Sequence, residues 1–127
     1  MRTIPSAEEL LDIVAQFLRT ESADPGTSNQ AYYLRVAANA IDIVRREVHL
    51  GAAADERARL RLRQLLPGCD GDLAALEARL AQAIRAGSLS TTSPELLEHL
   101  WHSALAEVAI DQPGYATFQR LTTGTAQ

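Results

Sequence analysis

The chain has 127 residues, of which 46% are hydrophobic and 22% charged, with a formal net charge of -4 and one cysteine. These values are typical of one globular domain and exclude a disulfide-linked scaffold, a membrane span and a long disordered chain. All 12 basic residues are arginine, and the acidic balance argues against nucleic acid as a partner. The N-terminal residues lack the apolar core of a secretion signal, so we expect a cytoplasmic protein.

The composition favours helices throughout. The chain contains 22 Ala and 18 Leu but only 6 aromatic residues, and Ala and Leu are strong helix formers whereas strands favour β-branched and aromatic residues. We therefore predict an all-α fold, a single-domain bundle of about five mostly antiparallel helices. The bundle domain spans residues 1–121, and residues 122–127 form a frayed C-terminal tail.

The first two predicted helices cover residues 7–21 and 30–50. Ser6 and Glu9 match a capping box at the start of the first helix. Leucine, valine and phenylalanine then recur every three or four residues as one apolar stripe, which is typical of an amphipathic helix. Residues 22–27 are rich in turn formers and predict a loop. Gly51 is placed to end the second helix, and residues 51–55 are predicted to be a loose connection.

Three further helices are predicted at residues 55–66, 73–86 and 93–110. Asp70 or Asp72 can cap the second of these, and Gly87 can end it. Ser93 followed by a proline is a strong helix start. We expect the last of the three to face inward with an apolar set made of Leu97, Leu100, Trp101, Ala104, Leu105 and Val108. Residues 115–121 are predicted to add one further turn.

Few residues are arranged for metal binding or catalysis. Glu98, His99 and His102 share one helix, where two histidines and a carboxylate can ligate a metal, but no other helix supplies ligands. We favour a solvated face with acid–histidine pairs and treat these three as weak metal candidates. Cys69 stands beside Asp70, which would raise rather than lower its thiol pKa. With no catalytic constellation, we expect no enzyme activity and no cofactor.

A polar row on the second predicted helix is the best candidate for a binding site. Arg35, Asn39, Asp42 and Arg46 follow one another at positions i, i+4, i+7 and i+11. The row has two interpretations. It is either a recognition patch or buried polar network, or a solvent-exposed face with local pairs. Tyr32 lies just before the row and is a candidate anchor for a partner, because aromatic residues and arginine dominate interface hot spots.

Several segments together resemble a known family. They are the opening run from Ser6 to Leu11, the stretch from Tyr33 to Ala40, and two later segments at residues 83–87 and 108–115. These resemble a family of small bacterial proteins with a domain of unknown function, over residues 5–118. Its members are often encoded beside aminoglycoside-phosphotransferase-like kinases and acyl-CoA dehydrogenases. The family more often has Asn before its last Pro, where this chain has Gln112.

The resemblance implies an accessory role in acyl-CoA or hydroxy-acid metabolism. We predict a non-enzymatic protein that binds a kinase-like or acyl-CoA dehydrogenase partner, with a homodimer also open. The alternative is a small-molecule binding protein in which Arg35 and Asn39 hold a carboxylate, a phosphate or an acyl-CoA. A closed pocket around these two residues would favour the small molecule, whereas an exposed patch would favour the protein partner.

Overall fold

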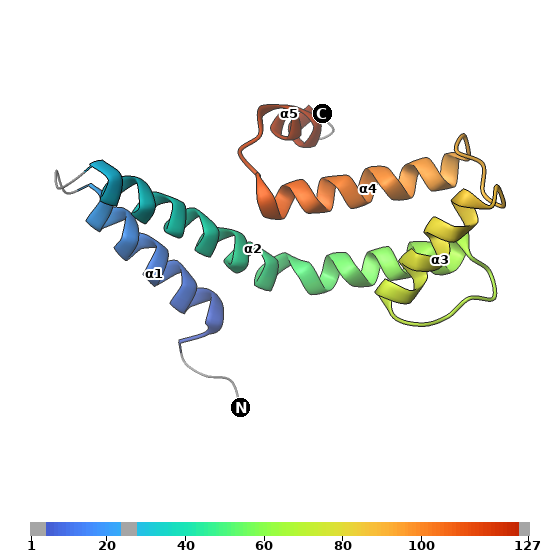
Figure 1. The fold of residues 1–127 in the computed structure, drawn as a ribbon, viewed down its shortest axis with the longest axis horizontal. Coiled ribbons are helices and arrows are strands. Elements are labelled where there is room, and N and C mark those ends of the chain that lie inside the picture. Colours follow the sequence, from blue (N-terminus) through green and yellow to red (C-terminus); the bar gives the residue numbers. More distant parts are fainter. Residues whose placement is uncertain (1–4, 24–27, 125–127) are drawn as a thin grey trace. The chain divides into compact units, whose positions relative to one another are not determined.

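The computed structural model describes residues 5–23 and 28–124, and all regular structure among them is helical. Within these ranges there are five helices, labelled in Figure 1: α1 (Ala7–Ser22), α2 (Ser28–Leu65), α3 (Leu73–Arg85), α4 (Pro94–Asp111) and α5 (Ala116–Gly124). The all-α prediction is confirmed. Among the described helices, none has a stretch apolar and long enough to span a bilayer.

The second and third predicted helices are a single helix, so the predicted stop at Gly51 is wrong. Helix α2 runs for 38 residues through Gly51 and through the predicted connection at residues 51–55. The residues that follow Gly51 are Ala-Ala-Ala-Asp-Glu-Arg-Ala, mostly strong helix formers. One glycine costs a helix only about 1 kcal/mol, so these neighbours outweigh it.

The predicted ends of the other helices are set by local hydrogen bonds. The capping box at α1 is confirmed, with the Ser6 hydroxyl accepting from the Glu9 amide at 3.2 Å. Asp72 caps α3 by accepting from the Ala75 amide at 2.9 Å. Ser93 caps α4. Gly87 follows α3 with φ of 79°, where the amides of Gly87 and Ser88 close a Schellman motif on Ile84 and Ala83.

The C-terminal helix α5 is longer than the single turn predicted. It reaches Gly124, three residues past Leu121. The hydroxyls of Thr122 and Thr123 donate to the carbonyls of Phe118 and Gln119, at 2.9 and 2.6 Å. Residues 122–124 of the predicted tail are therefore helical, and residues 125–127 lie outside the described part of the chain.

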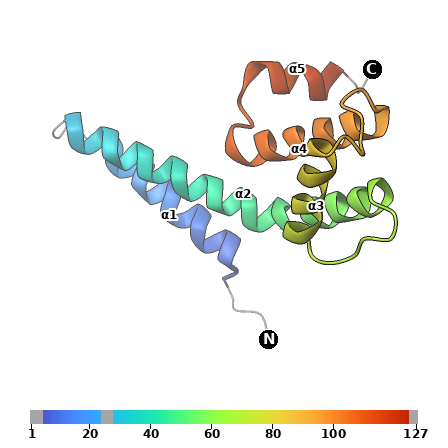
Figure 2. The ribbon, with the colours of Figure 1, turned by 45° about the vertical axis from the view of Figure 1, so that its right-hand side comes forward.

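The chain divides into two compact units, Met1–Gly51 and Ala52–Gln127, which are described separately. The first unit is a hairpin in which α1 runs antiparallel to the N-terminal part of α2 (Figures 1 and 2). Two contacts fix this direction, since Arg19 meets Asn39 while Glu8 meets His49, at 3.1 and 3.2 Å. Ala15 on α1 is fully buried.

The second unit is built on a leucine core. Its members come from the C-terminal part of α2, from the residue just after it, from α3 and from α4: Leu62, Leu66, Leu76, Leu80 and Leu96. Helix α5 packs on α4. Helix α4 runs antiparallel to α2, because Arg61 contacts both His99 and Ser103 while Leu65 and Glu95 line one cavity.

The predicted inner face of α4 is wrong for the first half of the helix, whereas Leu105 and Val108 farther along are partly buried. Leu97, Leu100 and Trp101 were expected in the core but are 51%, 46% and 50% exposed. The buried residues are Leu96 and His99, at 1% and 4%. Helix α4 carries apolar side chains of its own on most of its circumference, so hydrophobic spacing alone does not identify the face that is buried.

Candidate functional site

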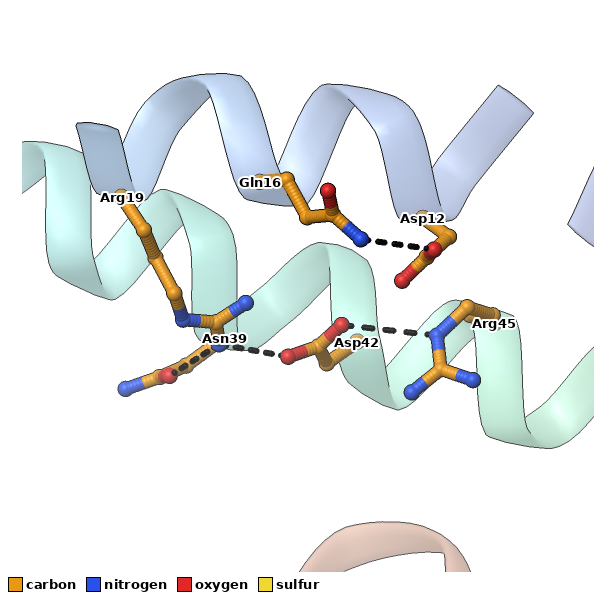
Figure 3. Close-up of polar contacts among 6 residues, drawn as sticks. All are labelled: Asp12, Gln16, Arg19, Asn39, Asp42 and Arg45. Carbon is orange, nitrogen blue, oxygen red and sulfur yellow. Dashed lines mark hydrogen bonds and ion pairs between the residues drawn. The ribbon is translucent and has the colours of Figure 1, made fainter. Parts of the chain in front are cut away.

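The predicted polar row lies in the first unit, where its two central residues meet an arginine from α1. Figure 3 shows Arg19 reaching across to α2. Its guanidinium donates to Asn39 Oδ1 at 3.1 Å and to Asp42 Oδ2 at 2.5 Å. The Asp42 side chain is 14% exposed and that of Arg19 is 44% exposed. Charge-assisted hydrogen bonds of this kind are the stronger class, so Arg19 fastens α1 to α2 in a defined register.

A second arginine supports the same carboxylate from its own helix. Arg45 Nε lies 3.5 Å from Asp42 Oδ1, on the side away from Arg19 (Figure 3). Asp42 therefore lies between two guanidinium groups, and its charge helps to hold the two helices together. Elsewhere on α1, the Gln16 amide donates to Asp12 at 2.9 Å.

The outer members of the row differ in exposure. Arg35 is exposed, and Arg46 is partly buried and engaged in a contact of its own. Asp42 pairs with Arg45 on its own helix, whereas Asn39 accepts a hydrogen bond from Arg19 on the other helix. Sequence reasoning missed Arg19. Its signal was its place four residues after Ala15, which puts it on the face of α1 that packs on α2.

Large apolar side chains lie exposed on the first unit. Four of them, spaced i, i+3, i+4 and i+7 on α1, form what we name the α1 outer face: Leu10, Ile13, Val14 and Phe17, exposed by 47%, 57%, 44% and 61%. At the start of α2, Tyr32 and Tyr33 are 57% and 69% exposed. Their rings meet edge to face with centroids 5.7 Å apart. Contiguous apolar patches on a surface mark interaction sites.

The weak metal candidates lie in the second unit and do not form a ligand set. Arg61 Nε donates to His99 Nδ1 at 3.0 Å, and its Nη2 lies 3.4 Å from Ser103 Oγ. His102 Nε2 lies 3.7 Å from Glu98 Oε1. Within residues 5–23 and 28–124, no group of three or more potential ligands is placed to hold a metal ion.

The hydrogen bond from Arg61 and the burial of the ring both favour neutral His99. Burial lowers its pKa, and the charges of Arg61 and His102 lower it further. The pKa of Arg61 is also lowered, first by burial and then by the nearby charge of Arg57. A neutral His99 accepts through Nδ1 and therefore carries its proton on Nε2. It faces a cavity of about 230 Å³ that Glu95, Glu98 and His102 also line.

Comparison with known families accounts for most of the chain. Residues 25–115 match the family described as Domain of unknown function (DUF6285). The chain belongs to this family. No curated protein and no solved structure matches it. The matched region contains Asn39, Asp42, Arg61 and His99 but begins after α1, so Arg19 and the α1 outer face lie outside it.

Proposed function

We propose that the chain is a non-enzymatic accessory protein of a bacterial cytoplasm, and that α1 docks its outer face into an apolar groove of a partner protein. The observation that carries this proposal is the exposure of Leu10, Ile13, Val14 and Phe17, each between 44% and 61%. Their i, i+3, i+4, i+7 spacing is the pattern by which a helix anchors itself in a groove.

The α1 outer face is distinct from the face that forms the hairpin. Ala15 is fully buried, with 0% of its surface exposed, and Leu11 and Leu18 beside it are partly covered. Helix α1 therefore has one apolar face on α2 and a second one exposed. Arg19, bound to Asn39 and Asp42, holds the helix in this orientation, so the outer face is presented already ordered, which reduces the entropic cost of binding.

The charges on α1 indicate what the groove must offer. The helix carries four acidic residues, Glu8, Glu9, Asp12 and Glu21, against the single basic residue Arg19. Glu9 and Glu21 are both exposed. A groove with a basic rim would complement them, and charge complementarity of this kind mainly sets specificity and association rate.

The family resemblance supplies the first partners to test, a phosphotransferase-like kinase and an acyl-CoA dehydrogenase. Tyr32 and Arg35, both exposed at the start of α2, are candidates for additional contacts. The rival proposal assigns a small ligand to Arg35 and Asn39. Both side chains are exposed, and the Asn39 oxygen already accepts from Arg19, which favours a protein surface over an enclosed ligand site.

The test is a titration of the purified chain with each candidate partner from the same organism, followed by calorimetry. The double variant Ile13→Ser, Phe17→Ser should lose at least about tenfold in affinity, because truncating a hot-spot side chain costs about 2 kcal/mol or more and about 1.4 kcal/mol is a factor of ten. Its melting temperature should match that of the parent, since both side chains are exposed. Leu97→Ser, a matched change at an exposed leucine of α4, should keep full affinity.

Three results would overturn the proposal. The first is binding of a partner that the double variant leaves unchanged. The second is a complete lack of binding by both candidate partners. The third is a dimer of the chain, seen by analytical ultracentrifugation, that the double variant dissolves. That outcome would make a second copy the occupant of the α1 outer face.

A further inference from the structure

A second candidate site lies in the other unit, in a cavity of about 550 Å³ bordered by α2, α4 and α5. This volume lies within the range of small-molecule pockets, about 300–1,000 Å³. Its wall combines apolar side chains with basic ones, chiefly Leu60, Leu105 and Phe118 with Arg57, Arg61 and His102. All of these residues belong to the unit Ala52–Gln127.

The described residues that line the cavity include two arginines and no carboxylate. Arg57 and Arg61 lie one helical turn apart on α2, and both line the cavity. Glu98 pairs with His102 but does not itself line the cavity. Among residues 5–23 and 28–124, neither arginine forms an ion pair. Two neighbouring guanidinium groups repel each other, and the pKa of Arg61 is lowered first by burial and then by the charge of Arg57. A bound anion would relieve the repulsion.

Arg61 is held in place by groups behind it. Its Nε donates to the buried His99, and its Nη2 to Ser103. A guanidinium has five N–H groups, so these two bonds leave three for a ligand. Both partners are uncharged, so they fix the position of Arg61 without neutralising its positive charge. That charge can therefore pair with an anion.

We propose that this cavity binds an organic carboxylate with an apolar body, its carboxylate against Arg57 and Arg61 and its body against Leu60, Leu105 and Phe118. Arginine matches the planar carboxylate in a bidentate geometry. The apolar wall distinguishes such a ligand from an inorganic anion. This site is separate from the α1 outer face and goes beyond the proposed function.

The test measures the dissociation constant of octanoate by calorimetry on the full chain. Octanoate should bind saturably, butanoate more weakly because it fills less of the apolar wall, and octanamide not at all because it lacks the charge. Arg57→Gln should raise the dissociation constant about tenfold. Arg57 is exposed, so this variant should fold normally. Arg85→Gln, a matched loss of charge at an exposed arginine of α3, should bind octanoate like the parent.

Equal binding of octanoate and octanamide would overturn the proposal, as would inorganic phosphate that binds as tightly as octanoate. Absence of saturable binding by both octanoate and dodecanoate would also overturn it. The Ile13→Ser, Phe17→Ser variant should bind octanoate normally. The partner proposal and the carboxylate proposal can therefore fail independently of each other.

Discussion

The two units of the chain bury different kinds of side chain. In the described part of the first unit, the fully buried residues are two alanines, Ala15 and Ala38, and the inter-helix bonds of Arg19 supply the specific contacts. In the second unit, four leucines from three helices, together with Leu66 just after α2, form a continuous core. A buried leucine contributes about 1.5–3 kcal/mol, whereas an exposed ion pair contributes about 0–1 kcal/mol.

The two units are therefore stabilised in different ways. The leucine core stabilises the second unit from within, and it holds the helices that line the carboxylate cavity. Among its described residues, the hairpin fully buries only two alanines, whose small side chains allow close approach of the helices but cover little area. Its polar bonds align α1 with α2, while the four apolar side chains of the α1 outer face are exposed.

The largest effect is expected from truncating the leucine core. Leu76 is fully buried, so Leu76→Ala removes apolar contacts and leaves a cavity, which costs about 2–5 kcal/mol of unfolding free energy. Urea unfolding followed by circular dichroism measures this cost. Leu97→Ala, at a leucine that is 51% exposed, should cost less than about 0.5 kcal/mol. Equal costs for the two variants would contradict the assignment of the core.

The second prediction concerns pH, and it is specific to the second unit. The pKa of His99 is lowered from 6.5 by burial and by the charges of Arg61 and His102, so the unfolded chain takes up this proton at a higher pH than the folded chain does. The stability that depends on neutral His99 is therefore complete above pH 6.5. It falls as the pH drops from there toward the lowered pKa, by at most about 1.4 kcal/mol per pH unit.

Urea unfolding between about pH 5 and pH 8 tests this linkage. The variant His99→Gln keeps an acceptor for Arg61 but has no titrating ring, so its stability should vary less with pH than that of the parent over this window. His102→Gln, on the exposed side of the same helix, serves as the control and should retain most of the parent's pH dependence. Identical pH profiles for the parent and His99→Gln would refute the prediction.

The third prediction separates the hairpin contacts from the exposed row. Asp42→Ala removes the acceptor shared by Arg19 and Arg45, and it should lower hairpin stability by about 1 kcal/mol, since Arg19 remains 44% exposed. Amide hydrogen exchange in α1 should become correspondingly faster. Arg35→Ala, at an exposed position of the same helix, should leave exchange unchanged. Faster exchange in both variants, or in neither, would show that Asp42 does not fasten α1.

Local signals in the sequence were sufficient for the helix ends. Ser6, Asp72, Ser93 and Gly87 all act where they were predicted, because a cap depends on residues within one turn of it. The faces of the helices were harder to predict. His99 was assigned to a solvated face and is buried, because the packing of α4 on α2 selects Leu96 and His99 over the leucines next to them.

The candidate site depended on contacts that spacing along one helix does not contain. The row on α2 drew attention to Asn39 and Asp42, but their partner Arg19 lies 20 and 23 residues earlier. Arg61 is one of several arginines on α2. Its bonds to His99 and Ser103, 38 and 42 residues later, give it a fixed position in a cavity wall. Such pairings arise only when two helices pack.

The smallest predicted effect tests the continuity of α2, where the two units meet in sequence. Gly51 has helical backbone geometry, and an added Cβ would lie 3.5 Å from Glu47 Cγ, an ordinary contact. Gly51→Ala should therefore stabilise the protein by about 0.5–1 kcal/mol, because alanine loses less backbone freedom in a helix. The matched change Gly87→Ala should have the opposite sign, since Gly87 has φ of 79° and a side chain there is strained. If Gly51→Ala destabilised the protein as Gly87→Ala does, Gly51 would be a helix stop, and α2 would be two helices as the sequence alone predicts.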